Sequence, residues 1–208
     1  MPIEKHVFTV HLGDKLQSIS DKELRAYAEK IGLHGIAESR YSWQFVIDLL
    51  LFHQVNGVDP YEILDEIRSL EGLRPSTGTK APTQFTREPL IGFWHKHFFS
   101  ARFVAHNIIN ELAGDKLSRL VEDVLDPNKS PIITKEMINE LAHRVTVESL
   151  ENRGRGGKLT GEWIVFAKHE EKNYYLTLCT HKVGDQALYE RINKICFPQF
   201  PFLQRERI

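Results

Sequence analysis

The sequence predicts an α+β fold, in which a mainly helical N-terminal portion accompanies a small antiparallel sheet built on residues 162–181. Two observations support this class. Residues 162–169 and 174–181 are runs rich in aromatic and β-branched side chains, separated by a short charged stretch, as in a β-hairpin. Ahead of them, apolar residues recur at helical spacing between capping signals.

The first 72 residues are predicted to be mainly helical after a short strand at 6–12. The run Ser20-Asp21-Lys22-Glu23 is a capping-box pattern that predicts a helix over 21–31. Ser42 is suited to cap a helix over 43–55 that is apolar nearly all round and is therefore expected to be buried. The dipeptide Asp59-Pro60 predicts the start of a third helix.

Residues 73–89 are rich in Pro, Thr and Gly and predict a linker or long loop. They would separate a helical region, 1–72, from an α+β region, 90–208. The apolar pattern that follows argues equally for one fused domain. The stretch lacks the order of a phosphate-binding P-loop, which excludes that motif.

Residues 90–113 are expected to be mostly helix, which sets the geometry of several histidines. On a helix, His97 points with the apolar stripe, whereas His95, Arg102 and His106 form a second line. That line is either a solvated face or an anion-binding stripe. His95 and His97 could share a metal only if they lay on a strand, where alternate residues share a face.

Further helices are predicted at 115–125, 135–152 and 185–196. The second contains Asn-Glu-Leu-Ala-His, which has asparagine where a zinc protease motif needs its first histidine, so that class is excluded. A glycine-rich basic loop, 153–158, leads into the hairpin. The last residues, 197–208, are expected to be either an extended arm packed on the domain or a tail that binds a protein partner.

Charge and composition narrow the function classes. Lys and Arg number 27 against 28 Asp and Glu, so any nucleic-acid partner must be bound through a local patch. Two cysteines give no disulfide framework, and no apolar run is long enough to span a bilayer. With no recognisable signal peptide, we expect a cytoplasmic protein with no membrane partner, no bound metal and no cofactor.

The predicted hairpin register places a carboxylate beside an imidazole. A loop centred on Glu171-Lys172 would pair Glu162 with His181, with their Cβ atoms about 5 Å apart. The ordinary interpretation is a cross-strand polar pair. The same register predicts one apolar face on the hairpin, formed by Trp163, Val165 and Ala167 against Leu176, Leu178 and Thr180.

The first functional hypothesis is an RNA-cleaving or RNA-binding protein that needs no metal. Glu162 and His181 would serve as the acid and base. Nearby hydroxyl and cationic groups would bind the substrate, namely Thr180, Lys182, Arg153, Arg155 and Lys158. Over the last third of the chain, the order of helix, basic loop and antiparallel sheet with a histidine near its end resembles the small bacterial ribonuclease toxins of the barnase and RelE kind.

Two alternatives remain open at this point. A non-catalytic protein–protein interaction module of a bacterial or mobile-element system would fit the neutral charge and the aromatic residues of 197–208. A metal site would use His95, His97 and a further histidine.

Overall fold

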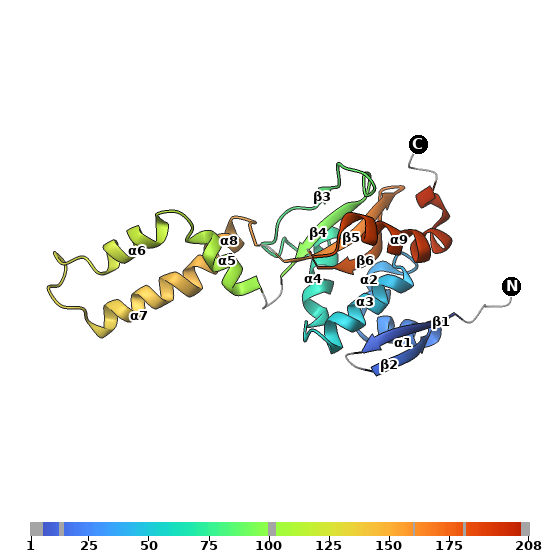
Figure 1. The fold of residues 1–208 in the computed structure, drawn as a ribbon, viewed down its shortest axis with the longest axis horizontal. Helices are drawn as coiled ribbons and strands as arrows, with labels where there is room; N and C mark the ends of the chain where they lie inside the picture. Colours follow the sequence, from blue (N-terminus) through green and yellow to red (C-terminus); the bar gives the residue numbers. More distant parts are fainter. Residues whose placement is uncertain (1–5, 13–14, 100–102, 160, 181, 205–208) are drawn as a thin grey trace. The chain divides into compact units, whose positions relative to one another are not determined.

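The computed structural model describes residues 6–12, 15–99, 103–159, 161–180 and 182–204, and it has the expected α+β class (Figure 1). The chain forms two compact units, which we call the sheet unit and the helical unit. The sheet unit is Met1–Ser76, Ala81–Phe98 and Glu162–Ile208, and the helical unit is Thr77–Lys80 and Phe99–Gly161. This division differs from the sequence-based one at 73–89. The strands that precede residues 99–161 in the sequence and those that follow them belong to one sheet.

The elements follow one another along each unit. The sheet unit contains β1 (Val7–Leu12), β2 (Lys15–Ser20), α1 (Asp21–Lys30), α2 (Leu33–Ala37), α3 (Trp43–Gln54), α4 (Pro60–Leu70), β3 (Thr83–Gln84), β4 (Trp94–Phe98), β5 (Glu162–His169), β6 (Lys172–Cys179), α9 (Asp185–Gln199) and the 3₁₀ turn Pro201–Gln204. The helical unit contains α5 (Val104–Glu111), α6 (Lys116–Val124), α7 (Lys135–His143), the π-helical turn Arg144–Glu148 and α8 (Ser149–Arg155). Among the described residues, no helix has the length and apolar character needed to cross a bilayer.

The helix-start signals in the first 72 residues are confirmed. Ser20 and Glu23 form both hydrogen bonds of a capping box at α1. Ser42 accepts a hydrogen bond from the backbone N–H of Phe45 and caps α3. Asp59 caps α4, whose first residue is Pro60.

The central sheet has the antiparallel order β3-β4-β5-β6, and its hairpin register differs from the predicted one. Trp163 pairs with Cys179 and His169 with Lys172. The sequence pattern suggested a four-residue loop, whereas Glu170 and Glu171, with φ of 48° and 61°, make a two-residue turn. A bulge between Val165 and Phe166 then shifts the register once more.

Helices cover both faces of the β5–β6 hairpin, so it has two apolar faces where the predicted register gave only one. On one face, Ile164, Phe166 and Tyr175 pack in a cluster with residues of α1, α3 and α4. On the other face, Val165 and Leu176 pack against α9. Two buried faces give a run of apolar residues instead of strict alternation.

The chain after α9 adds to the second of these clusters. Phe197, Phe200 and Leu203 are all buried there, and they belong to α9 and to the 3₁₀ turn that follows it. Of the two expectations for 197–208, packing on the domain therefore holds for residues up to 204, in helical form. Residues 205–208 lie outside the described part of the chain.

The prediction of helix over most of 90–113 was wrong at its start. Residues 94–98 form strand β4, and helix α5 begins only at Val104. The sequence Trp-His-Lys-His-Phe satisfies both periods: its aromatic residues fit a helical stripe, and its histidines alternate as on a strand. Pairing with β5 favours the strand, because β4 supplies that strand with its second neighbour.

The outer edge of β6 is closed by residues at the start of α3. The backbone N–H of Tyr175 donates to the carbonyl of Arg40 at 2.8 Å, and that of Ser42 donates to the carbonyl of Tyr175 at 2.9 Å. Further along, the N–H of Leu178 donates to the Asp48 carboxylate at 3.0 Å. These bonds satisfy edge groups that would otherwise be open to another strand.

The Asp48 carboxylate is buried. It also accepts hydrogen bonds from the Thr177 hydroxyl and from the Gln44 amide, the latter at 2.8 Å. Burial raises the pKa of Asp48 from its usual 3.8 to about 6, while Arg191 and the hydrogen bonds act in the opposite direction. Burial therefore outweighs all of the donors that stabilise the charged form.

We expect the substitution Asp48→Asn to remove a pH dependence of stability between pH 4 and 6. The folded state keeps the Asp48 proton up to about pH 6, whereas the unfolded state releases it near pH 4. The stabilisation is therefore complete below pH 4 and is lost as the pH rises to 6, by up to about 3 kcal/mol. Urea denaturation at pH 4, 5, 6 and 7 measures the difference between wild type and variant.

The control is Asp65→Asn in the same unit. A hydrogen bond from Arg74 lowers the pKa of Asp65 below its usual 3.8, so its stabilisation is lost only at lower pH and its difference curve should be nearly flat from pH 5 to 7. A difference curve for Asp48→Asn that is flat from pH 4 to 6 would contradict the prediction.

Candidate functional site

Strand β4 places His95 and His97 on the same face of the sheet. His95 lies opposite Val165 and His97 opposite Trp163 on β5. The two imidazole centroids are 5.8 Å apart, and the indole of Trp163 lies 4.8 Å from His95 and 6.3 Å from His97. The sequence had allowed the two histidines to converge only on a strand, and the structure meets that condition.

A fourth ring covers this group. Phe85 follows β3, and its ring lies 4.7 Å from His95 and 5.7 Å from Trp163. Its backbone N–H donates to the carbonyl of Phe93 at 2.8 Å, which joins the residue that follows β3 to the residue that precedes β4. His97 is buried, whereas His95, Trp163 and Phe85 are partly exposed. We call these four residues the histidine–aromatic cluster.

The opposite face of β4 is held by a buried ion pair. The Lys96 ammonium lies 3.2 Å from the Glu66 carboxylate on α4, and the two side chains are only 4% and 2% exposed. Strand alternation requires that Lys96 and the two histidines point to opposite faces. The ion pair therefore fixes the strand that carries His95 and His97 onto α4.

The predicted pair Glu162 and His181 is only partly within the described structure. Glu162 is 3% exposed and lies opposite Phe98, on the face away from His97 and Trp163. His181 lies outside the described residues. Thr180 is partly exposed just after β6, and Lys182 is exposed. Glu162 is thus a buried carboxylate on the face of the sheet opposite His95 and His97.

The basic residues of 153–158 have different environments within the helical unit. Arg153 is buried, and its guanidinium donates to the Asn107 side chain at 3.1 Å and to the carbonyl of Lys158. Arg155 and Lys158 are exposed, and Arg155 donates to Asn152 at 3.0 Å. Arg153 therefore shapes the local backbone, and the other two remain accessible to an anion.

Part of this stretch is helix and not loop. Gly154 and Arg155 belong to α8, and the backbone of Gly78 lies so close to Gly154 that a Cβ at Gly78 would be 2.7 Å from the Gly154 carbonyl oxygen. Gly78 also has φ of 81°, so both the spacing and the conformation there require glycine.

The second line of cations predicted on 90–113 does not form as expected. His106 lies on α5, is exposed, and is 2.9 Å from the Asn110 amide. Arg102 lies outside the described residues. His95 belongs to the sheet unit and His106 to the helical unit, so the helical periodicity that grouped them does not apply.

A metal would need more ligands than the histidine pair supplies. Zinc takes three or four protein ligands, and two imidazoles alone leave such a site incomplete. In the described ranges, no group of three or more His, Cys, Asp or Glu side chains is placed to hold an ion. The chemistry that the pair supports directly is proton transfer.

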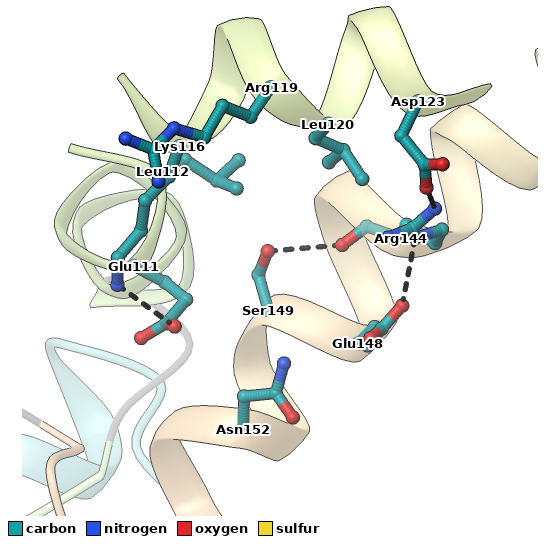
Figure 2. Close-up of a pocket in the computed structure, with 10 residues that line it drawn as sticks. All are labelled: Glu111, Leu112, Lys116, Arg119, Leu120, Asp123, Arg144, Glu148, Ser149 and Asn152. Carbon is teal, nitrogen blue, oxygen red and sulfur yellow. Dashed lines mark hydrogen bonds and ion pairs between the residues drawn. The ribbon is translucent and has the colours of Figure 1, made fainter. Parts of the chain in front are cut away.

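The helical unit has a cavity of about 380 Å³ lined by α6, the π-helical turn and α8 (Figure 2). Its charged groups take part in ion pairs, including that of Arg119 with Asp115 outside the lining. Arg144 reaches Asp123 at 2.7 Å and Glu148 at 3.4 Å, and Lys116 reaches Glu111 at 3.4 Å. Hydrogen bonds from Arg144 and Lys129 lower the pKa of Asp123 to about 2. These pairs link the helices and leave few groups for a ligand.

No protein-family model, curated protein or solved structure matches this chain. The interpretation of the histidine–aromatic cluster therefore depends on its own geometry.

We expect Lys96→Met to destabilise the sheet unit by about 3–5 kcal/mol, because it leaves the Glu66 carboxylate buried without its cation. The double substitution Lys96→Met with Glu66→Met should recover most of that loss, since both charges are then removed. Urea denaturation measures all three proteins.

Arg25→Met serves as the control, since it breaks an exposed pair with Glu29 and should change stability by less than about 1 kcal/mol. A Lys96→Met variant as stable as this control would show that the ion pair does not anchor β4.

Proposed function

We propose that the protein cleaves RNA without a metal, with His95 and His97 as the acid–base pair and Trp163 as a stacking surface for a base. The observation that carries the proposal is the convergence of two imidazoles and an indole on one sheet face. Imidazole titrates near neutral pH, and aromatic side chains bind unstacked RNA bases.

The chemistry needs only these groups and the RNA. One imidazole, in its neutral form, removes the proton of a 2′-hydroxyl, and the oxygen attacks the adjacent phosphorus. The bond from phosphorus to the 5′-oxygen breaks, and the other imidazole, in its protonated form, donates a proton to that oxygen. The products are a 2′,3′-cyclic phosphate and a 5′-hydroxyl, and no external reactant is consumed.

The surroundings of the pair suit this role. The Phe85 ring lies against both His95 and Trp163, so a nucleobase that displaced it would find an aromatic contact already shaped. Lys96 and Glu66 hold β4 from behind, which limits movement of the two histidines. Lys182 is an exposed cation of the same unit, and it remains our proposed contact to a phosphate.

We expect the purified protein to cleave total RNA in EDTA, and His95→Gln or His97→Gln to slow cleavage by about 100-fold or more. Glutamine keeps the polar character and approximate length but cannot transfer the proton. Gel analysis gives the rate, and end-group analysis should find 2′,3′-cyclic phosphates.

The controls are His106→Gln, an exposed histidine of the helical unit, and His181→Ala, which tests the site expected from the sequence. Both should cleave at the wild-type rate. Loss of cleavage in His181→Ala with full activity in His95→Gln and His97→Gln would place the site at the sequence-predicted position instead.

A second candidate function, protein–protein interaction, is favoured by the poor burial of the helical unit. Among its described hydrophobic residues, Val124 alone is buried. Six large apolar side chains in it are at least 44% exposed, namely Ile109, Leu117, Ile132, Ile133, Ile138 and Val147. A small unit with so few buried residues lacks the core that most domains of its size need.

We propose a second copy of this chain as the occupant of that surface. Acidic and basic residues nearly balance in the helical unit, so two copies would not repel each other. Both α6 and α7 carry exposed apolar residues, and a pair of two-helix layers is the smallest arrangement that gives such helices a common core.

We expect a dimer by light scattering at micromolar concentration, and Ile138→Glu should convert it to a monomer because the charge would be buried in the interface. His143→Glu introduces the same charge on α7 but lies five residues from Ile138, on a different side of the helix, so it is the matched control and should leave the dimer intact. A wild-type protein that is monomeric at all concentrations would exclude the second-copy role.

A further inference from the structure

A second cavity lies in the sheet unit, and none of the residues that line it belongs to the histidine–aromatic cluster. It measures about 730 Å³ and is lined by residues of β1, α3, β6 and α9, together with Asn56, Thr180 and Val183. Sites for small organic molecules typically enclose several hundred cubic ångströms and combine apolar walls with a few polar groups. The cavity thus has a suitable size for such a ligand.

Its walls are largely apolar. Phe8 and Val10 of β1 face Ile47 and Leu51 of α3, and Ile195 of α9 completes the lining. Val10, Ile47 and Leu51 also belong to or pack on the main core, so these walls are part of the fold. A hydrocarbon or aromatic body would find contacts on several sides.

The polar lining is asymmetric in charge. Arg191 and Lys194 lie three residues apart on α9, which puts them on the same side of the helix. Arg191 contacts Asp48 at 3.7 Å, beyond hydrogen-bonding distance, and its side chain is 34% exposed. Lys194 is exposed. Both cations are therefore placed to donate to an anion in the cavity.

Asp48 does not compete for the ligand. Its two oxygens already accept hydrogen bonds from Thr177, Leu178 and Gln44. The guanidinium of Arg191, in contrast, has five donor hydrogens in a planar fork suited to a carboxylate or phosphate. Its long contact with Asp48 leaves most of these donors available.

We propose that this cavity binds a small amphipathic anion, whose carboxylate or phosphate head is held by Arg191 and Lys194 and whose apolar body lies against β1 and α3. The site is independent of the proposed RNA cleavage, because none of its lining residues belongs to the histidine–aromatic cluster. The acid group of the ligand supplies orientation, and the apolar body supplies most of the buried area.

The test uses the fluorescent probe 1-anilinonaphthalene-8-sulfonate, an aromatic anion, on the full-length protein. We expect saturable binding that decanoate and decyl phosphate displace and that decan-1-ol displaces at least tenfold more weakly. The ratio of the concentrations at which decanoate and decyl phosphate displace half of the probe distinguishes a carboxylate ligand from a phosphate ligand. Near-UV circular dichroism confirms that the protein remains folded throughout.

Three substitutions locate the binding. Lys194→Met and Arg191→Met should each weaken the affinity for the probe by roughly tenfold, since each removes a charge-assisted contact. Leu51→Trp should abolish binding by filling the cavity. Lys194→Met leaves the Asp48–Arg191 contact intact, so it remains informative if Arg191→Met unfolds the protein.

The control is Arg25→Met, which removes an exposed arginine on α1 that does not line this cavity. It should bind the probe as the wild type does. Probe binding that is unaffected by both Lys194→Met and Leu51→Trp, or that decan-1-ol displaces as well as decanoate, would overturn the proposal.

Discussion

The closure of the β6 edge is the constraint on which much of the sheet unit depends. An edge strand presents unpaired N–H and C=O groups, and here the start of α3 supplies partners for them through Arg40, Ser42 and Asp48. The Ser42 hydroxyl has two roles, since it caps α3 and also donates to the carbonyl of Leu176. The position of α3 along the sheet is therefore set by hydrogen bonds as well as by apolar packing.

A second polar network reinforces this edge from the end of α4. Glu71 accepts hydrogen bonds from Arg40 at 2.8 Å, from the Asn173 side chain at 3.0 Å and from the buried Tyr175 hydroxyl at 2.6 Å. It thus ties the C-terminus of α4 to β6. It also holds Arg40, whose carbonyl accepts the hydrogen bond from Tyr175 at the edge of that strand. Like Asp48, Glu71 accepts several hydrogen bonds, and these offset the cost of removing each carboxylate from water.

The sequence predicted the parts of the fold that local chemistry determines. Ser20, Ser42 and Pro60 mark helix starts because capping depends on a few neighbouring residues. The hairpin itself was predicted, but its register was not. The register depends on the backbone conformation of Glu170 and Glu171, and glutamate is not a residue that sequence statistics place at positive φ.

The candidate site was only partly predictable, because its geometry depends on tertiary pairing. His95 and His97 were identified as residues of interest, yet the helical pattern around them separated their side chains. Pairing of β4 with β5 reverses that conclusion and adds Trp163, which had been assigned to the core. Glu162 shows the opposite case, since the same pairing buries a carboxylate that the isolated hairpin would have left accessible.

The alternation along β4 explains how one short strand combines a rigid support with the face that carries the proposed acid–base pair. Lys96 points to α4 and forms a buried ion pair, and its neighbours on either side, His95 and His97, point to the opposite face. Separating the two charges would leave each of them buried without a partner, which costs more free energy than the intact pair contributes to stability. The strand therefore resists displacement although the net gain in stability from the pair is small. Proton transfer between two groups benefits from such fixed positions, because the barrier rises steeply when the donor and acceptor are misplaced. The buried ion pair is therefore best understood as a support for the geometry of the histidines.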